Sequence, residues 1–199
     1  MQQIEPHASS TAAKTARRMR PRRDSGFTLI ELLVVVAIIS IIAAIAIPGL
    51  LRARMTGNEA SAIATLRVTT SSEIAYAATC GGGAFADSYP VLATPPAGGV
   101  PFVPAELSVA VPVKSGFRFT LEESTAVEGE GLTDCNGTPA VAGFYATAVP
   151  VGPGSTGARA FAVNTEMTIW QNVDATAAPT EAQMSGPPGG GVSPISPIQ

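Results

Sequence analysis

The longest hydrophobic run of the chain follows a basic N-terminal segment. From Leu32 to Leu51 there is no charged side chain over 20 residues, and Glu31 is the single carboxylate at the head of this run. A helix rises about 1.5 Å per residue, so the run spans about 30 Å, the thickness of the apolar core of a bilayer. The pattern predicts a membrane-spanning helix. A carboxylate at its edge is costly, which indicates that Glu31 has a partner and a function.

Helical periodicity continues beyond this run at lower hydrophobicity. Apolar or small residues recur every three or four positions, and they are Ala60, Ile63, Ala64, Ile74, Ala77 and Ala78. Arg67 and Ser71 interrupt this stripe, so we expect the second part of the helix to be half-buried. One helix is predicted over residues 27–79, and it should end at Cys80-Gly81-Gly82-Gly83, because glycine both caps and breaks a helix.

The remaining chain has the pattern of loops and strands. Residues 84–115 contain six prolines, which favours a loop with short turns at 87–90 and 104–107. Four β-rich runs follow, at 117–121, 143–149, 158–163 and 167–170. They predict an antiparallel sheet of about four strands with one face on the helix. Its expected core residues are Phe117, Phe119, Leu121, Phe144 or Tyr145, Phe161, Val163, Ile169 and Trp170.

These elements predict an α+β protein built from a long N-terminal helix and a small antiparallel sheet. The expected organisation, in chain order, is a basic leader at 1–26, a transmembrane half of the helix at 27–51, an exposed half at 52–80, a loop-and-sheet domain at 81–174 and a tail at 175–199. The tail is rich in proline and glycine and cannot bury enough apolar surface to offset its ordering entropy, so we expect it to be disordered.

Charge is distributed unevenly along the chain. The whole sequence carries a net charge of −3, the leader about +4 and the remainder about −7. Six basic residues precede the apolar run and only Arg52 and Arg54 follow it closely, which predicts that the N-terminus lies inside and the domain outside. A second methionine, Met19, opens a shorter leader of eight residues and is an alternative start.

Residues 22–51 resemble the N-terminus of type IV prepilins and of the pseudopilins of type II secretion. Gly26 matches the residue before the family's cleavage site. Phe27 matches the first mature residue, which becomes N-methylated, and Glu31 matches the fifth-position glutamate. Many pilins carry a proline where this chain has Pro48. Pro48-Gly49 is then either a simple kink or, as the resemblance implies, a segment that unwinds when subunits pack into a filament.

The resemblance implies a structural subunit with a type IV pilin-like fold. It would be trimmed after Gly26 and would polymerise through its N-terminal helix, which is the role expected for Glu31. The implied partners are further copies of the chain, a prepilin peptidase, an inner-membrane assembly platform and a motor ATPase. Before assembly the protein would be a single-pass inner-membrane protein, and afterwards part of a surface pilus or a periplasmic pseudopilus.

Other interpretations remain open at this point. A pseudopilin of a type II secretion system is the alternative within the family, although such proteins often carry a Pro-Trp-Gly-type stretch that this chain lacks. Ala44-Ile45-Ala46 resembles the cleavage site of an ordinary signal peptide, which would leave Glu31 unexplained. A plain membrane anchor that carries a ligand-binding or enzymatic domain is the third possibility.

Histidine usage argues against an enzyme. The single histidine, His7, lies in the leader, so the mature part lacks the side chain that Ser-His-Asp, Cys-His and His-metal sites require. We therefore expect no catalytic residue, no cofactor and no metal. Basic residues after the leader are few, namely Arg52, Arg54, Arg67, Lys114, Arg118 and Arg159, and form no cluster beyond the first pair. Nucleic-acid binding is not expected.

Two further features concern the domain. Cys80 and Cys135 are the only cysteines, and an even pair in an exported domain predicts a disulfide, the alternative being two free thiols. An acidic run follows the first predicted strand and comprises Glu122, Glu123, Glu128, Glu130 and Asp134. It lacks the spacing of a calcium loop, which favours a solvated acidic loop over a calcium site.

Overall fold

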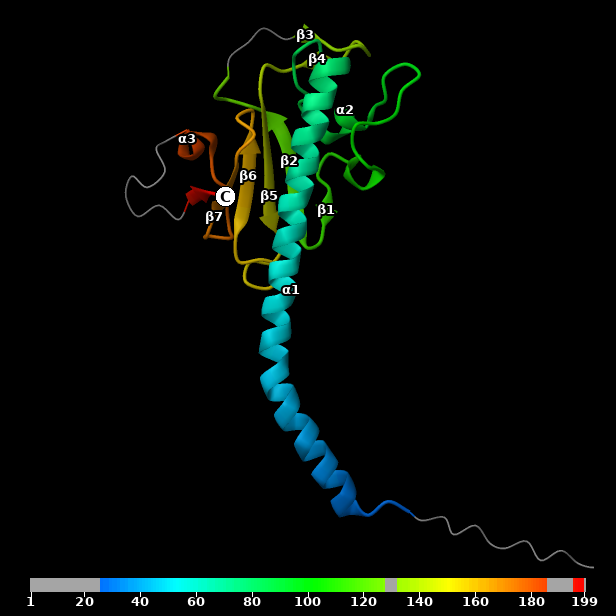
Figure 1. The fold of residues 1–199 in the computed structure, drawn as a ribbon, viewed down its shortest axis with the longest axis vertical. Coiled ribbons are helices and arrows are strands. Elements are labelled where there is room, and N and C mark those ends of the chain that lie inside the picture. Colours follow the sequence, from blue (N-terminus) through cyan, green and yellow to red (C-terminus); the bar gives the residue numbers. More distant parts are fainter. Residues whose placement is uncertain (1–25, 128–131, 186–194, 199) are drawn as a thin grey trace, which may run out of the picture. The chain divides into compact units, whose positions relative to one another are not determined.

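The computed structural model describes residues 26–127, 132–185 and 195–198, and it has the predicted α+β architecture (Figure 1). Helix α1 covers Leu29–Thr79, and two short helices follow it, α2 at Tyr89–Ala93 and η1 at Ala105–Leu107. The chain divides into two compact units, residues 1–43 and 44–199. The second unit contains the sheet and the part of α1 that packs on it.

The main sheet has six antiparallel strands in the order β1-β2-β5-β6-β7-β8. Their bounds are Val113–Lys114, Phe117–Glu123, Phe144–Pro150, Ala160–Asn164, Ile169–Asn172 and Ile195–Pro197. Strands β3 (Leu132–Thr133) and β4 (Pro139–Ala140) pair in a second, two-stranded sheet. The four predicted strands are β2, β5, β6 and β7. The two edge strands escaped prediction because they are two and three residues long and adjoin prolines.

The face of helix α1 that packs against the sheet is not the one predicted from its apolar stripe. The buried residues are Glu59, Ala62, Thr65, Leu66, Thr69, Ser72, Glu73 and Tyr76. Ala60, Ala64 and Ile74, which belong to the predicted stripe, are exposed. The prediction was wrong because polar side chains on the buried face find partners: the Thr65 and Thr69 hydroxyls donate to carbonyls one turn earlier.

Aromatic residues of the sheet form the core against α1, as predicted. Phe117, Phe119, Phe144 and Phe161 are fully buried in one cluster with Leu66 of the helix. Phe144, not Tyr145, is the core residue at that point of β5. The Tyr145 side chain is half-buried, and its hydroxyl donates a hydrogen bond to the Pro179 carbonyl at 2.6 Å.

The stretch after β7 corrects the prediction of a disordered tail from residue 175. Helix α3 covers Glu181–Met184 and begins with a capping box of Thr180 and Gln183, and β8 pairs with β7. Met184 and Ile195 pack with Trp170 in a small second cluster. The composition of the tail did not predict these elements, because only a few of its apolar side chains pack against Trp170, and those few suffice to order the short segments. Residues 186–194 and 199 lie outside the described part of the chain.

The end of α1 is closed by glycines and by a disulfide, both as predicted. Gly82 and Gly83 have φ values of 62° and 99°, which a side chain would strain. Cys80 forms a disulfide with Cys135 in the β3–β4 turn, with the two Cα atoms 4.8 Å apart. Beside it, the Tyr76 hydroxyl donates to the buried Asp134 carboxylate at 3.0 Å. Asp134 is therefore a structural acceptor, while Glu128 and Glu130 of the acidic run lie outside the described residues.

Candidate functional site: the N-terminal segment of α1

Gly26 and Phe27 precede the first turn of α1 in non-helical backbone. A Cβ placed on Gly26 would meet no atom within 4 Å, so nothing in the described chain requires glycine there. Phe27 is 86% exposed, whereas phenylalanine side chains are usually buried in folded proteins. Both residues are therefore free to interact with a molecule other than this chain.

Glu31 caps the helix, a contact that the sequence prediction missed. Its Oε2 accepts hydrogen bonds from the Thr28 backbone N–H at 2.9 Å and from the Thr28 hydroxyl at 2.6 Å. The Glu31 N–H lies 3.3 Å from the Thr28 hydroxyl oxygen and donates to it. This reciprocal arrangement is a capping box, and the Thr-x-x-Glu spacing in the sequence could have revealed it. Glu31 thus has a structural role within its own helix.

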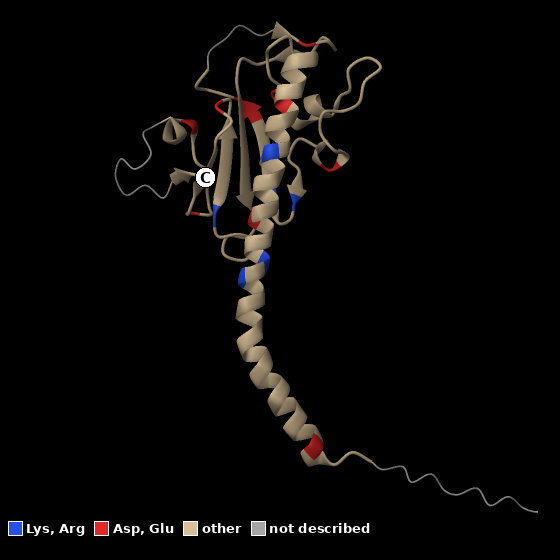
Figure 2. Ribbon diagram, in the orientation of Figure 1, with Lys and Arg blue, Asp and Glu red and all other residues tan. Residues whose placement is uncertain are grey.

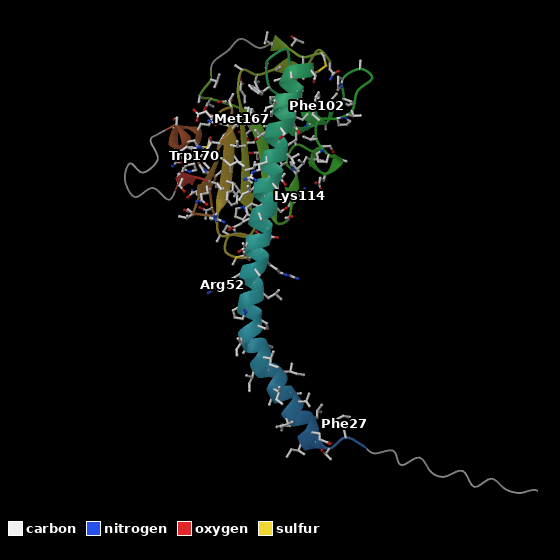
Figure 3. All side chains as sticks on the ribbon, in the orientation of Figure 1. Phe27, Arg52, Phe102, Lys114, Met167 and Trp170 are labelled. Atoms are coloured by element: carbon white, nitrogen blue, oxygen red, sulfur yellow. A yellow bond between two sulfur atoms is a disulfide. The ribbon has the colours of Figure 1, made fainter. Side chains whose placement is uncertain are left out.

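The apolar side chains that follow Glu31 are not covered by any other described part of the chain. The most hydrophobic 18-residue window of α1 has a mean hydropathy of 3.0, and none of it is buried. Figure 3 shows these side chains pointing outward from the helix that begins beside Phe27. Among the described residues, α1 is the one helix long and apolar enough to cross a membrane. So much exposed apolar surface requires a lipid or protein partner.

Pro48 and Gly49 lie inside α1, and the helix continues through both. Proline leaves the carbonyl one turn earlier without its helical donor, and glycine costs about 1 kcal/mol relative to alanine in a helix. A Cβ on Gly49 would meet nothing within 4 Å, so no close packing among the described residues explains this glycine. The pair is a local weak point of the helix.

A buried carboxyl, Glu73, lies in the core of the second unit. Its side chain is fully buried, Oε2 accepts the Ala86 N–H at 2.9 Å, and Oε1 has no hydrogen-bond partner in the described structure. Burial raises the pKa of Glu73 to about 8, the Ala86 hydrogen bond opposes the shift, and nearby Asp87 adds to it. The described residues contain no group of three or more His, Cys, Asp or Glu side chains that could hold a metal ion.

Comparison with known proteins identifies the N-terminal segment. A family model described as the prokaryotic N-terminal methylation motif matches residues 21–47. Residues 21–47 thus carry this motif, and we refer to them as the pilin-type segment. The pilin-type segment therefore includes Gly26, Phe27 and Glu31, and it ends just before Pro48.

A curated relative carries the same segment. The type IV wide pilus major component PilA4 of Thermus thermophilus is 60% identical over 38 residues, which are 19% of this chain and 29% of PilA4. The chain thus matches less than a third of that relative's length. No solved structure matches the chain significantly. Both similarities are confined to the N-terminal part of the chain.

Proposed function

We propose that this chain is the structural subunit of a type IV pilus-like filament. The observation that carries the proposal is the pilin-type segment at the head of an apolar helix that no other described residue covers. In a filament, the same helices of neighbouring copies would bury this surface. Burial of apolar area at about 25 cal/mol per Å² makes such association favourable.

Processing precedes assembly in this account. A prepilin peptidase cleaves between Gly26 and Phe27, and the new amino group of Phe27 is methylated. The absence of any packing demand at Gly26 supports an external reason for the glycine, because a small residue lets the scissile bond approach a protease. Cleavage removes the basic leader but leaves the Thr28–Glu31 capping box intact.

Glu31 then pairs with the Phe27 amine of a neighbouring copy. In an apolar layer an ionised carboxylate is unfavourable unless it is paired. The Thr28 hydrogen bonds occupy Oε2 of Glu31 and leave Oε1 without a hydrogen-bond partner among the described residues. One oxygen can therefore cap the helix while the other meets a cation.

Before assembly, the protein is held in the inner membrane with its N-terminus inside. Arg52 and Arg54 are exposed on α1 just beyond the apolar run, where their guanidinium groups reach lipid head groups. An assembly platform and a motor ATPase extract the subunit into the growing filament. The weak point at Pro48-Gly49 allows α1 to unwind locally as the helices pack together.

Electron microscopy of sheared surface material, with gold-labelled antibody against the domain, tests this proposal. We expect labelled filaments along their length in wild-type cells. Label restricted to short periplasmic assemblies would indicate a secretion pseudopilus instead. Membrane-bound monomers without filaments, in cells whose other pili assemble normally, would contradict the role as a filament subunit.

A further inference from the structure

An open groove lies between α1 and the β7–β8 side of the sheet. Its volume is about 470 Å³, and its lining includes Arg67 and Ser71 of α1, Met167 and Thr168 before β7, and Ile198 after β8. Met167 is labelled in Figure 3, beside the upper part of the sheet. Cavities of this size hold a few side chains of a ligand or of another protein.

The polar groups of the groove are free to bind a carboxylate. The Arg67 side chain is exposed and makes no ion pair or hydrogen bond within residues 26–127, 132–185 and 195–198, whereas Lys114 pairs with Glu106 and Arg159 with Glu59. The hydroxyls of Ser71 and Thr168, which also line the groove, likewise have no hydrogen-bond partner in these ranges. A guanidinium flanked by two hydroxyl donors suits a carboxylate, which accepts several hydrogen bonds at once.

The far wall of the groove is held in an unusual backbone conformation. Met167 has a φ of 64°, which is uncommon for a residue with a long side chain. Two hydrogen bonds fix the turn, from the Met167 N–H to the Asn164 carbonyl and from the Glu166 N–H to the Asn164 side chain. Strain of this kind persists where the surrounding structure enforces it and clusters at binding sites. Here it places Met167 and Thr168 on the lip of the groove.

A complementary acidic corner lies elsewhere on the same chain. Glu122 and Glu123 end strand β2 and are exposed, and their side chains make no hydrogen bond or ion pair with other described residues. Figure 2 shows acidic residues at that end of β2. Phe119 and Leu121 of the same strand face the α1 core, so alternation points Glu122 to the opposite face of the sheet.

We propose that the Arg67 groove binds the Glu122–Glu123 corner of a second copy of this chain. The inference rests on the proposed filament function and adds to it a contact between domains, outside the apolar helices. Groove and corner are different patches, so their pairing is heterologous. A heterologous contact repeats from copy to copy, and where the rotation between copies does not close a ring it forms an open helical chain, as a filament requires.

Charge reversal in the full-length chain, in its native cells, tests the contact. We expect Arg67→Glu, and separately Glu122→Lys with Glu123→Lys, to lower the yield of sheared filaments about tenfold, because like charges then face each other. Combining all three substitutions should restore the yield to within about twofold of wild type. Arg118→Glu is the matched control, because it makes the same change in net charge at an exposed arginine outside the groove.

Cross-linking provides a second readout that does not depend on filament yield. Chains with Arg67→Cys and chains with Glu122→Cys, expressed together, should form a reducible dimer that neither variant forms alone. Single reversals that assemble like wild type, a triple variant that is not rescued, or an Arg118→Glu defect of equal size would overturn the proposal. If the wild-type chain forms filaments in the same experiment, any of these outcomes contradicts the proposed groove contact and not the filament function. Absence of wild-type filaments would instead contradict the filament function itself.

Discussion

Glu59 on α1 and Arg159 before β6 form an ion pair that holds the helix on the sheet. The Arg159 Nε and Nη2 atoms donate to Glu59 Oε2 at 3.0 and 2.6 Å, and the backbone N–H groups of Ala158 and Arg159 donate to Oε1 at 2.8 and 3.1 Å. Glu59 is 5% exposed, so its charge is satisfied almost wholly by these four donors. The pair lies at the start of the part of α1 that packs on the domain.

Removal of Arg159 should loosen the helix from the sheet. Loss of one partner of a buried pair costs about 3–5 kcal/mol, and because 36% of the Arg159 side chain is exposed we expect Arg159→Ala to cost about 1–3 kcal/mol. Urea unfolding of the detergent-solubilised protein, followed by Trp170 fluorescence, measures this. Arg118→Ala, at an exposed arginine, should change stability by less than about 0.5 kcal/mol. Equal effects of the two substitutions would contradict the structural role of the pair.

The disulfide should be quantitatively formed and should stabilise the domain. Cys80 and Cys135 are 55 residues apart, and closing a loop of that size contributes up to about 4 kcal/mol in the chain-entropy model. We expect no alkylation of the native protein before reduction, faster migration on a non-reducing gel, and a lower urea midpoint for Cys80→Ser with Cys135→Ser. Labelling of both thiols in the unreduced native protein would show that Cys80 and Cys135 are not bonded.

Glu73 should make the domain less stable as the pH rises. Its pKa is about 8 when folded against an ordinary value of 4.5, so between these values the folded state binds a proton that the unfolded state has lost. The contribution of Glu73 to the free energy of unfolding is therefore at its maximum below about pH 4.5. It falls by about 1.4 kcal/mol per pH unit up to about pH 8.

Substitution isolates this contribution from other titrating groups. Glu73→Gln keeps an acceptor for the Ala86 N–H and cannot ionise, so its stability relative to wild type should increase steadily from pH 5 to pH 8. Parallel pH profiles of the two proteins in urea unfolding would show that Glu73 is charged in the folded domain, contrary to the prediction.

Glu31 has an observed role as a helix cap and a proposed role in filament assembly, and substitution can separate the two. Glutamine retains the side-chain acceptor that caps the helix at Thr28 but carries no charge, whereas alanine removes both. If pairing with the Phe27 amine drives assembly, Glu31→Gln and Glu31→Ala should both insert and be cleaved, and both should fail to form filaments. Filaments of Glu31→Gln at the wild-type level would show that capping alone is needed. Formation of the Cys80–Cys135 disulfide in each variant serves as the folding control.

Elements with strong local patterns could be predicted from the sequence. Features that depend on contacts between residues far apart in the chain could not. The helix over Leu29–Thr79, the strands β2, β5, β6 and β7, and the disulfide follow from period, composition and cysteine count. The buried face of α1 was predicted wrongly, because Glu59 and Glu73 look like surface residues until their donors at Arg159 and Ala86 are known. Such long-range pairs leave no local signal.

The candidate site shows the same division. The pilin-type segment is contiguous, so Gly26, Phe27 and Glu31 could be recognised together. The groove at Arg67 joins α1 to residues about 100 and 130 positions later, and only the fold brings them together. The turn at Met167 and the edge strand β8 that build its far wall are short and irregular, which is why the sequence did not reveal them.

Mass spectrometry of the mature N-terminus tests the central claim most directly. Protein purified from cells that contain the native processing machinery should begin at Phe27 and carry one additional methyl group on its α-amine. An N-terminus at Ile47 would show cleavage of an ordinary signal peptide after Ala46. A mature protein that still begins in the leader would show a plain membrane anchor, and either result would contradict the assignment of this chain as a processed filament subunit.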